Sequence, residues 1–197
     1  MDDLNLSGIK PETRTLNDMR NVLFDSAWAE KQTDCDLYYM YRGVREINDL
    51  RYDITVMPAK MLGKEYLKTK GHEHCVGHSE LYKVLEGEAM FLSQKGKDEI
   101  EDVVAINASQ GDIVVVPRGG YSHITINPSE TDTLKIANWV SLDCESNYDF
   151  IESKKGACYF YTIDGWIKNP NYKTVPELRF ENPLKEFPEH LSFLKEN

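Results

Sequence analysis

The chain has 197 residues, and its 33 acidic and 23 basic side chains give a formal net charge of −10 at neutral pH. This acidity argues against nucleic acid as a partner, because proteins that bind nucleic acid usually present a basic face. No apolar run approaches the length of about 18 residues that a membrane helix needs, so we expect no membrane span. The length suits one domain with a sizeable core.

The N-terminal residues and the cysteines indicate the compartment. The chain begins Met1-Asp2-Asp3-Leu4, without the basic and apolar regions of a signal peptide. The cysteines show no paired spacing, and they are Cys35, Cys75, Cys144 and Cys158. We therefore expect reduced thiols in a cytoplasmic protein.

The first part of the chain is expected to be an irregular arm followed by a short helix. The arm covers residues 1–15, and apolar residues recur at near-helical spacing between Leu16 and Glu30. Thr15 or Asn17 can cap the start of this helix.

Short strand-like segments then follow one another closely, separated by turns rich in Gly and Pro. We expect strands at residues 37–42, 54–57, 88–92, 103–107, 112–116, 123–126, 133–140 and 159–163. Residues 59–68 are expected to form a loop, residues 168–188 an extended segment, and residues 188–195 a last short helix. The pattern is typical of an all-β sandwich or barrel, which we place at about residues 36–142.

Residues 69–87 contain the side chains that indicate chemistry. If they form a strand, a turn and a second strand, His72 and His74 point to the same face. Glu80 lies at the start of the second strand. When the two strands fold as a hairpin with the His72 face inward, two imidazoles and a carboxylate converge, and this set suits divalent transition metals.

A fourth ligand is expected farther along the chain. After the strand at residues 112–116 and a Pro/Gly turn, His123 lies on the next strand and is the natural additional ligand. His78 is an alternative, although its place in the predicted turn favours a solvent-facing side chain. Cys75 is adjacent to His74 and therefore points to the opposite face, which makes it a poor ligand.

Each of these residues also has a purely structural interpretation. A single histidine is more often an ordinary buried side chain, and Tyr82, on the Glu80 strand, can be core packing. The combination of three histidines with Glu80 in this order favours a metal site. The four lysines between positions 60 and 70 either attract an anionic ligand or belong to a solvated loop.

The motifs resemble those of the cupin-type glucose-6-phosphate isomerases of archaea and some bacteria. That family shows Thr-x-Gly-His-x-His and then Glu-x-Tyr-x-x-Leu-x-Gly. The chain has Thr69-Lys70-Gly71-His72-Glu73-His74 and then Glu80-Leu81-Tyr82-Lys83-Val84-Leu85-Glu86-Gly87. Leu16-Asn17-Asp18-Met19 is similar to the family's Leu-x-Asp-Met. The resemblance covers residues 12–170, and each metal-binding motif is one loop residue longer than usual for cupins.

The resemblance implies a cupin fold: a double-stranded β-helix, or jelly-roll barrel, with a short N-terminal helix and extended terminal segments. It implies one divalent transition metal per chain (Fe, Mn, Ni or Zn), with the ligands His72, His74, Glu80 and His123. It also implies a sugar phosphate as ligand, with a phosphate pocket of hydroxyls and backbone amides at Thr55, Thr69 and Gly71, and with Tyr82 as a cavity tyrosine.

Two departures from the family concern the sugar. Trp139 stands where family members carry a Tyr, and we place it among the substrate-binding residues. Ser146-Asn147-Tyr148 stands where the family has His-Asp-Tyr, so a polar histidine that contacts the sugar is missing.

The function implied is a metal-dependent aldose–ketose isomerase that interconverts glucose 6-phosphate and fructose 6-phosphate. In an enediol route, Glu80 or a metal-bound hydroxide is the base and Tyr82 relays the proton. In a hydride shift, the metal polarises the carbonyl. The alternatives are an isomerase or epimerase of another sugar, a cupin oxygenase, and a non-catalytic sugar-phosphate-binding cupin.

We expect one structural domain made of three stretches. They are an N-terminal arm and helix at residues 1–35, the barrel with its following segment at 36–167, and an extended tail at 168–197. Family members are dimers, so the resemblance implies a homodimer, for which the aromatic run of residues 38–41 is a candidate interface strand. Packing within the barrel explains this run equally well.

Overall fold

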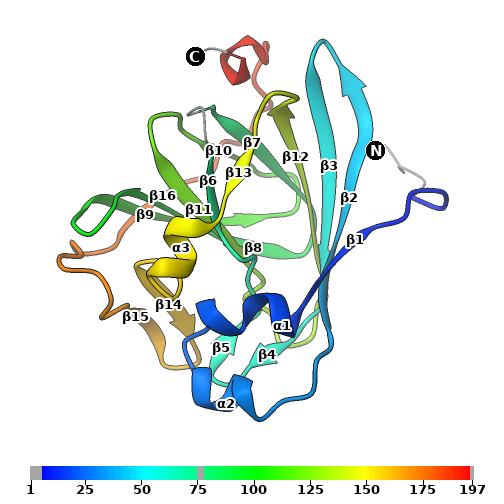
Figure 1. The fold of residues 1–197 in the computed structure, drawn as a ribbon. Coiled ribbons are helices and arrows are strands. Elements are labelled where there is room, and N and C mark those ends of the chain that lie inside the picture. The colour runs from blue at the N-terminus through cyan, green and yellow to red at the C-terminus, as the bar shows by residue number, and fades with distance from the viewer. Residues whose placement is uncertain (1–5, 75–77, 196–197) are drawn as a thin grey trace.

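A computed structural model describes residues 6–74 and 78–195 and shows a molecule built mainly from β-strands (Figure 1). The first large sheet has six strands in the order β1-β2-β3-β12-β7-β10, all paired antiparallel. These strands are β1 (Glu12–Thr15), β2 (Asp36–Ile47), β3 (Leu50–Met57), β12 (Leu134–Ser141), β7 (Glu80–Glu86) and β10 (Ile113–Val116).

The second large sheet also has six strands, in the order β13-β6-β11-β8-β9-β16. They are β13 (Ser146–Asn147), β6 (His72–His74), β11 (Tyr121–Ile126), β8 (Glu88–Gly96), β9 (Ile100–Ser109) and β16 (Arg179–Glu181). The last of these pairs parallel to β9, and the other pairs are antiparallel. A small third sheet contains β15 (Gly165–Lys168), β14 (Tyr159–Thr162), β5 (Glu65–Tyr66) and β4 (Met61–Leu62).

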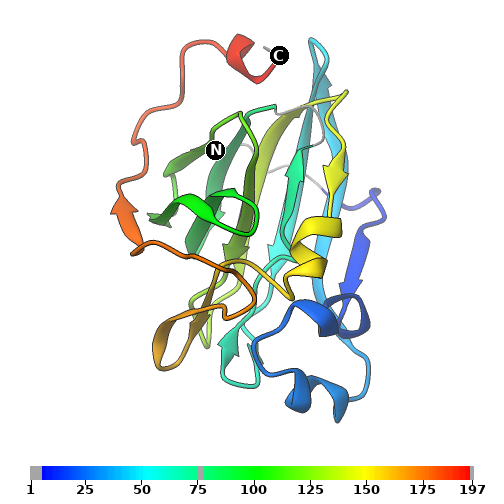
Figure 2. The ribbon, with the colours of Figure 1, turned by 60° about the vertical axis from the view of Figure 1, so that its left-hand side comes forward.

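The helical segments are all short. They are α1 (Leu16–Met19), α2 (Ser26–Glu30), α3 (Asp149–Ser153) and the 3-10 turns η1 (Arg20–Val22) and η2 (Ser192–Leu194). Figure 1 places α1 and α2 with β4 and β5 at one end of the molecule and the C-terminal turn at the other. Figure 2 shows the chain after β15 running along the outside of the barrel up to that turn. None of the described helices is long and apolar enough to cross a membrane.

Apolar side chains from both large sheets fill the space between them. Met57 and Leu134 of the first sheet are fully buried, in one cluster with Phe91 and Val104 of the second. The chain also crosses repeatedly from one sheet to the other, because β6, β7, β8 and then β9, β10, β11, β12 alternate between the sheets. Two facing sheets joined by such crossings form a jelly roll. The all-β cupin fold expected from the sequence is therefore confirmed.

The hairpin predicted for residues 69–87 is wrong in one respect. β6 pairs with β11 and β13, whereas β7 pairs with β12 and β10, so the two strands lie in different sheets. Residues 75–77, where the turn was predicted, lie outside the described residues. Alternation along a strand shows which side chains share a face, but it does not show which strand is the neighbour. As a result, the site is assembled across the space between the two sheets.

The predicted helix at residues 16–30 is broken into α1, η1 and α2. The break occurs where the amide of Phe24 donates a hydrogen bond of 2.9 Å to the buried carboxylate of Glu65. The Asp25 carboxylate then accepts a bond of 2.8 Å from the amide of Trp28 and caps a new helix. Tertiary contacts therefore override a continuous apolar periodicity.

Three other segments contain strands that the sequence did not indicate. The arm contributes β1, the loop at residues 59–68 contains β4 and β5, and the extended tail contributes β16. Each of these strands has two to four residues. Segments this short carry too few alternations to be recognised by period. The short C-terminal helix predicted at residues 188–195 is present as the 3-10 turn η2.

Candidate metal centre

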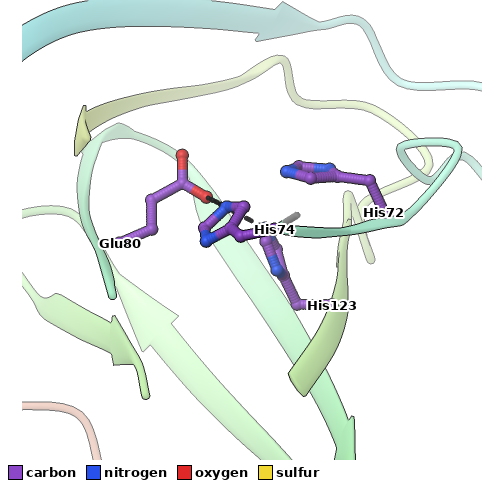
Figure 3. A group of neighbouring side chains, drawn as sticks. All are labelled: His72, His74, Glu80 and His123. Carbon is purple, nitrogen blue, oxygen red and sulfur yellow. Dashed lines mark hydrogen bonds and ion pairs between the residues drawn. The ribbon is translucent and has the colours of Figure 1, made fainter. Parts of the chain in front are cut away.

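Three strands bring the four predicted ligands together. β6 carries His72 and His74, and β11 places His123 in register with His72. Glu80 comes from β7 in the other sheet and faces the imidazoles (Figure 3). One possible ligand atom from each of the four residues lies within 4.8 Å of the others.

Gly71 allows this close approach of β6 to β11. Its φ of +85° lies in the left-handed region, and a Cβ at this position would come within 2.5 Å of the Ile124 side chain. Any larger residue would therefore separate the strand of His72 from the strand of His123.

The carboxylate of Glu80 is buried and makes a different contact through each oxygen. Oε2 lies 3.2 Å from Nε2 of His74 and 3.1 Å from Nε2 of His123. Oε1 accepts a hydrogen bond of 2.6 Å from the side-chain amide of Asn138 on β12. Burial raises the pKa of Glu80, but the hydrogen bonds with His123 and His74 outweigh it and hold this pKa well below its usual value. Glu80 is therefore an ionised carboxylate whose Oε2 is directed at the imidazoles.

The orientation of His74 is fixed by a backbone group. Its Nδ1 donates a hydrogen bond of 2.7 Å to the carbonyl of His78, so Nε2 is the nitrogen that faces Glu80. Burial, followed by the charge of His123, lowers the pKa of His72 well below its usual value, which keeps this imidazole neutral. The prediction that His78 is solvent-facing is wrong, because only 5% of this residue is exposed.

This donor set fits a divalent transition metal. It offers three imidazole nitrogens and one carboxylate oxygen, the ligand types that Fe, Mn, Ni and Zn accept. A carbonyl holds His74, and the Asn138 amide holds Glu80, in the way that outer groups orient metal ligands in proteins. The residues present therefore match the metal that the sequence motifs imply.

Tyr82 lies directly beside this centre. Its hydroxyl is 3.0 Å from Nε2 of His123, and only 7% of the residue is exposed. Burial, and then the charge of Glu80, raise the pKa of Tyr82 well above its usual value. The phenol therefore keeps its proton at neutral pH and can donate a hydrogen bond at the site.

The centre opens into a cavity between the two large sheets. The predicted substrate residues Thr55, Thr69, Gly71 and Tyr82 all line it. The prediction for Trp139 does not fit the structure: this residue lies in an outer groove, and its ring is 4.7 Å from that of Tyr52. Its neighbours on β12 have the opposite orientation, so Asn138 and Val140 line the cavity in its place.

Several cavity residues were not indicated by the sequence. Arg42 and Arg51 line the wall, whereas the resemblance implied hydroxyls and backbone amides for the phosphate pocket. Ser146 lines it at the position of the family's histidine, and so does Tyr148, whose ring centroid is 5.7 Å from that of His72. The alternation that places Trp139 on the outside would have indicated Asn138, but no local signal distinguishes Arg42 and Arg51 from the chain's other basic residues.

The cysteines have three different environments. Cys35 is exposed, Cys158 is buried and Cys144 is partly buried in the cavity lining, and all three are free thiols. Cys75 lies outside the described residues.

Comparisons with known proteins match most of the chain to one family. The family model described as "Glucose-6-phosphate isomerase (GPI)" matches residues 13–177. A glucose-6-phosphate isomerase of Pyrococcus furiosus is 29% identical over 177 residues, which cover 85% of this chain and 91% of that protein. One of Thermococcus gammatolerans is 30% identical over 154 residues, covering 76% and 79% of the two chains.

Solved structures with related folds are more distant. An oxalate oxidase has a TM-score of 0.45 and 14% identity and covers 56% of this chain and 54% of its own. A cupin-2 domain containing protein from Shewanella frigidimarina has a TM-score of 0.38 and 16% identity. The match covers 62% of this chain and 95% of that protein. The family match extends over most of the chain and includes all four residues of the metal centre. The chain therefore belongs to the glucose-6-phosphate isomerase family.

Proposed function

We propose that the buried centre of His72, His74, Glu80 and His123 is the active site at which this enzyme interconverts glucose 6-phosphate and fructose 6-phosphate. The observation that carries the proposal is the convergence of four ligand-type side chains, within 4.8 Å of one another, in the wall of a polar cavity. Membership of the family supports the isomerisation as the reaction, and the geometry supports the four-residue centre as the active site.

A divalent transition metal held by these four residues, which is Fe, Mn, Ni or Zn in this proposal, would polarise the sugar carbonyl. Glu80 contributes an oxygen that Asn138 aims at the imidazoles. Its low pKa makes it a good ligand and a weak base, so removal of the C2 proton requires Glu80 to leave the imidazoles. Tyr82, which stays protonated, can donate to a sugar oxygen and return that proton.

The phosphate is proposed to bind at Thr55, Thr69 and the amide of Gly71. The Thr69 hydroxyl accepts a hydrogen bond of 3.0 Å from the backbone amide of Thr125, which fixes the oxygen and leaves its own proton to donate. Thr55 lines the same cavity from β3 and is only 7% exposed. This arrangement supports a pocket that binds phosphate through hydroxyls and an amide.

Two further proposals concern the whole molecule. A homodimer is supported by the resemblance of the motifs and by Tyr39 and Tyr41, which are partly exposed on β2. A cytoplasmic location is supported by the free thiols of the described cysteines. Light scattering of the purified protein tests the dimer directly.

The reaction itself is tested with purified protein and fructose 6-phosphate, the product being detected by a coupled dehydrogenase assay. We expect conversion of fructose 6-phosphate and much slower conversion of unphosphorylated fructose. No turnover of fructose 6-phosphate with any of the four metals would contradict the proposed function. The same reaction in deuterated water separates the two routes, because only the enediol route introduces deuterium from the solvent.

A further inference from the structure

One wall of the cavity holds a buried carboxylate between two arginines. Asp53 on β3 is completely buried. It accepts hydrogen bonds from Nη1 of Arg42 at 2.9 Å, from the amide of Gly43 at 2.8 Å and from Nε of Arg51 at 2.9 and 3.0 Å. A bulge in β2, with Gly43 at a φ of +62°, brings its amide to this carboxylate. The two oxygens of Asp53 therefore hold both arginines and the Gly43 amide.

The charges of this group do not cancel. One carboxylate faces two guanidinium groups, which leaves one net positive charge within this group, and the carboxylate of Glu80 toward the same end contacts His74 and His123 instead. The carboxylate of Glu12 lies 3.7 Å from Nε of Arg42, but its side chain is 66% exposed and its charge is screened by water. The positive wall stands out in a chain whose net charge is −10.

Arg51 has donors that Asp53 does not use. It contacts Asp53 through Nε, and among the described residues no hydrogen bond or ion pair involves either of its Nη atoms. Its side chain lines the cavity and is 27% exposed. The paired Nη groups of an arginine match two oxygens of a phosphate. Asp53 therefore holds Arg51 with its phosphate-binding edge unoccupied by protein.

The backbone position of Arg51 is well separated from that of Thr55 in the proposed phosphate pocket. Thr55 and Arg51 share the inner face of β3 and are four residues apart, which corresponds to about 13 Å along a strand. On the neighbouring strand β12, Ile136 is opposite Thr55 and Val140 is opposite Arg51. Because Trp139 is opposite Leu81 on β7, Glu80 lies at the Arg51 end of the cavity. The two anion-binding features thus lie at opposite ends, with the metal centre toward Arg51.

We propose that Arg51 forms a second anion subsite and that the cavity binds sugars phosphorylated at both ends. The inference rests on the proposed function only for the first phosphate, at Thr55 and Thr69. The second phosphate binds the Nη edge of Arg51, and Asp53 acts as a positioning residue. A ketose with a phosphate ester on C1 cannot become an aldehyde there by moving hydrogen between C1 and C2. Such a sugar is therefore bound without conversion and inhibits the enzyme competitively.

The test compares fructose 1,6-bisphosphate with fructose 6-phosphate by calorimetry on EDTA-treated protein, so that a metal cannot supply the second contact. We expect the bisphosphate to bind about tenfold or more tightly than the monophosphate, as charge-assisted hydrogen bonds allow. Arg51→Met should reduce this ratio to near one. Arg45→Met is the matched control, because Arg45 is an exposed arginine on the same β2–β3 pair and should leave the ratio unchanged.

Arg51→Lys is a control for misfolding. It keeps a cation beside Asp53 but removes the paired donors that would bind the phosphate. The ratio should fall severalfold in this variant while the thermal unfolding curve stays close to wild type. Equal affinity for the two sugars in the wild type, no detectable binding of the bisphosphate, or an unchanged ratio in Arg51→Met would each overturn the proposal. The coupled assay decides the proposed function separately, since binding to metal-free protein does not depend on turnover.

Discussion

The substitution Glu80→Gln tests the role of the carboxylate at the centre of the site. Oε1 of Glu80 accepts a hydrogen bond from Asn138, and Oε2 faces His74 and His123. As long as Asn138 keeps its NH₂ toward residue 80, a glutamine can satisfy only one of these sides. With its oxygen toward the imidazoles, its NH₂ meets the NH₂ of Asn138; with its oxygen toward Asn138, its NH₂ takes the ligand position.

The expected effect has two parts. Misorientation of the amide should weaken metal binding by about 10- to 100-fold, the usual effect of disturbing the groups that hold a ligand. If Glu80 is also the base, kcat should fall by about 10²- to 10⁴-fold even when the metal is saturating. The metal loss should be smaller than in a variant that lacks an imidazole ligand.

A second substitution separates the loss of metal affinity from the loss of the catalytic base. Adding Asn138→Asp to Glu80→Gln supplies a carboxylate that accepts from the glutamine NH₂, which turns the glutamine oxygen toward His74 and His123. Metal affinity should recover in this double variant, while kcat should stay low because the base is still missing. In Asn138→Asp alone, two carboxylates share the 2.6 Å contact, so one of them must take a proton.

The assay measures metal content by elemental analysis and kcat by coupled turnover at saturating metal. A Glu80→Gln enzyme with wild-type kcat at full metal occupancy would remove Glu80 from the chemistry and leave it a ligand only. Failure of the double variant to recover metal would refute the orienting role of Asn138.

Three further predictions address the pocket, the phenol and the outer strand. Thr69→Val should raise KM for fructose 6-phosphate about tenfold with kcat retained, whereas Thr69→Ser should stay close to wild type; an unaltered KM in the valine variant contradicts the phosphate pocket. Tyr82→Phe should lower kcat about tenfold or more at unchanged metal content, because a hydrogen-bond donor beside His123 is lost; wild-type kcat would assign Tyr82 to packing alone. Hydrogen bonds from Arg179 depress the pKa of Asp102 to about 2, so the stability gained from this pair is present above the carboxyl's usual pKa and is lost as pH falls toward 2. Asp102→Asn should therefore lower Tm at pH 7 but not near pH 2, and an equal difference at both pH values is inconsistent with this linkage.

The sequence indicated most of the strands because alternation and turn residues are local signals. It could not indicate that β6 and β7 lie in different sheets, since pairing depends on strands far away in the chain. The helix at residues 16–30 failed for the same reason, because Glu65 takes the amide of Phe24. The strands β1, β4 and β5 were missed because they are short and carry no clear alternation.

The sequence predicted the metal-binding part of the site better than the walls of the cavity. The four residues expected as ligands could be selected because their chemistry and order are specific, and the structure brings one possible ligand atom of each within 4.8 Å of the others. Trp139 was misplaced because the comparison with the family's tyrosine overrode the alternation that sets Asn138 inward. The positions of Arg42 and Arg51 depend on the buried charge of Asp53, and a sequence does not show which acidic residue is buried.

The most direct test of the account measures metal content and turnover together in the wild type, His123→Ala and His78→Ala. The wild type should contain one divalent metal per chain, lose turnover of fructose 6-phosphate in EDTA and regain it when Fe, Mn, Ni or Zn is added back. His123→Ala should lose both metal and turnover. His78→Ala should keep both, because His78 contacts His74 through its backbone carbonyl. Full turnover without metal, or wild-type metal content in His123→Ala, would contradict the assignment of the metal centre as the active site.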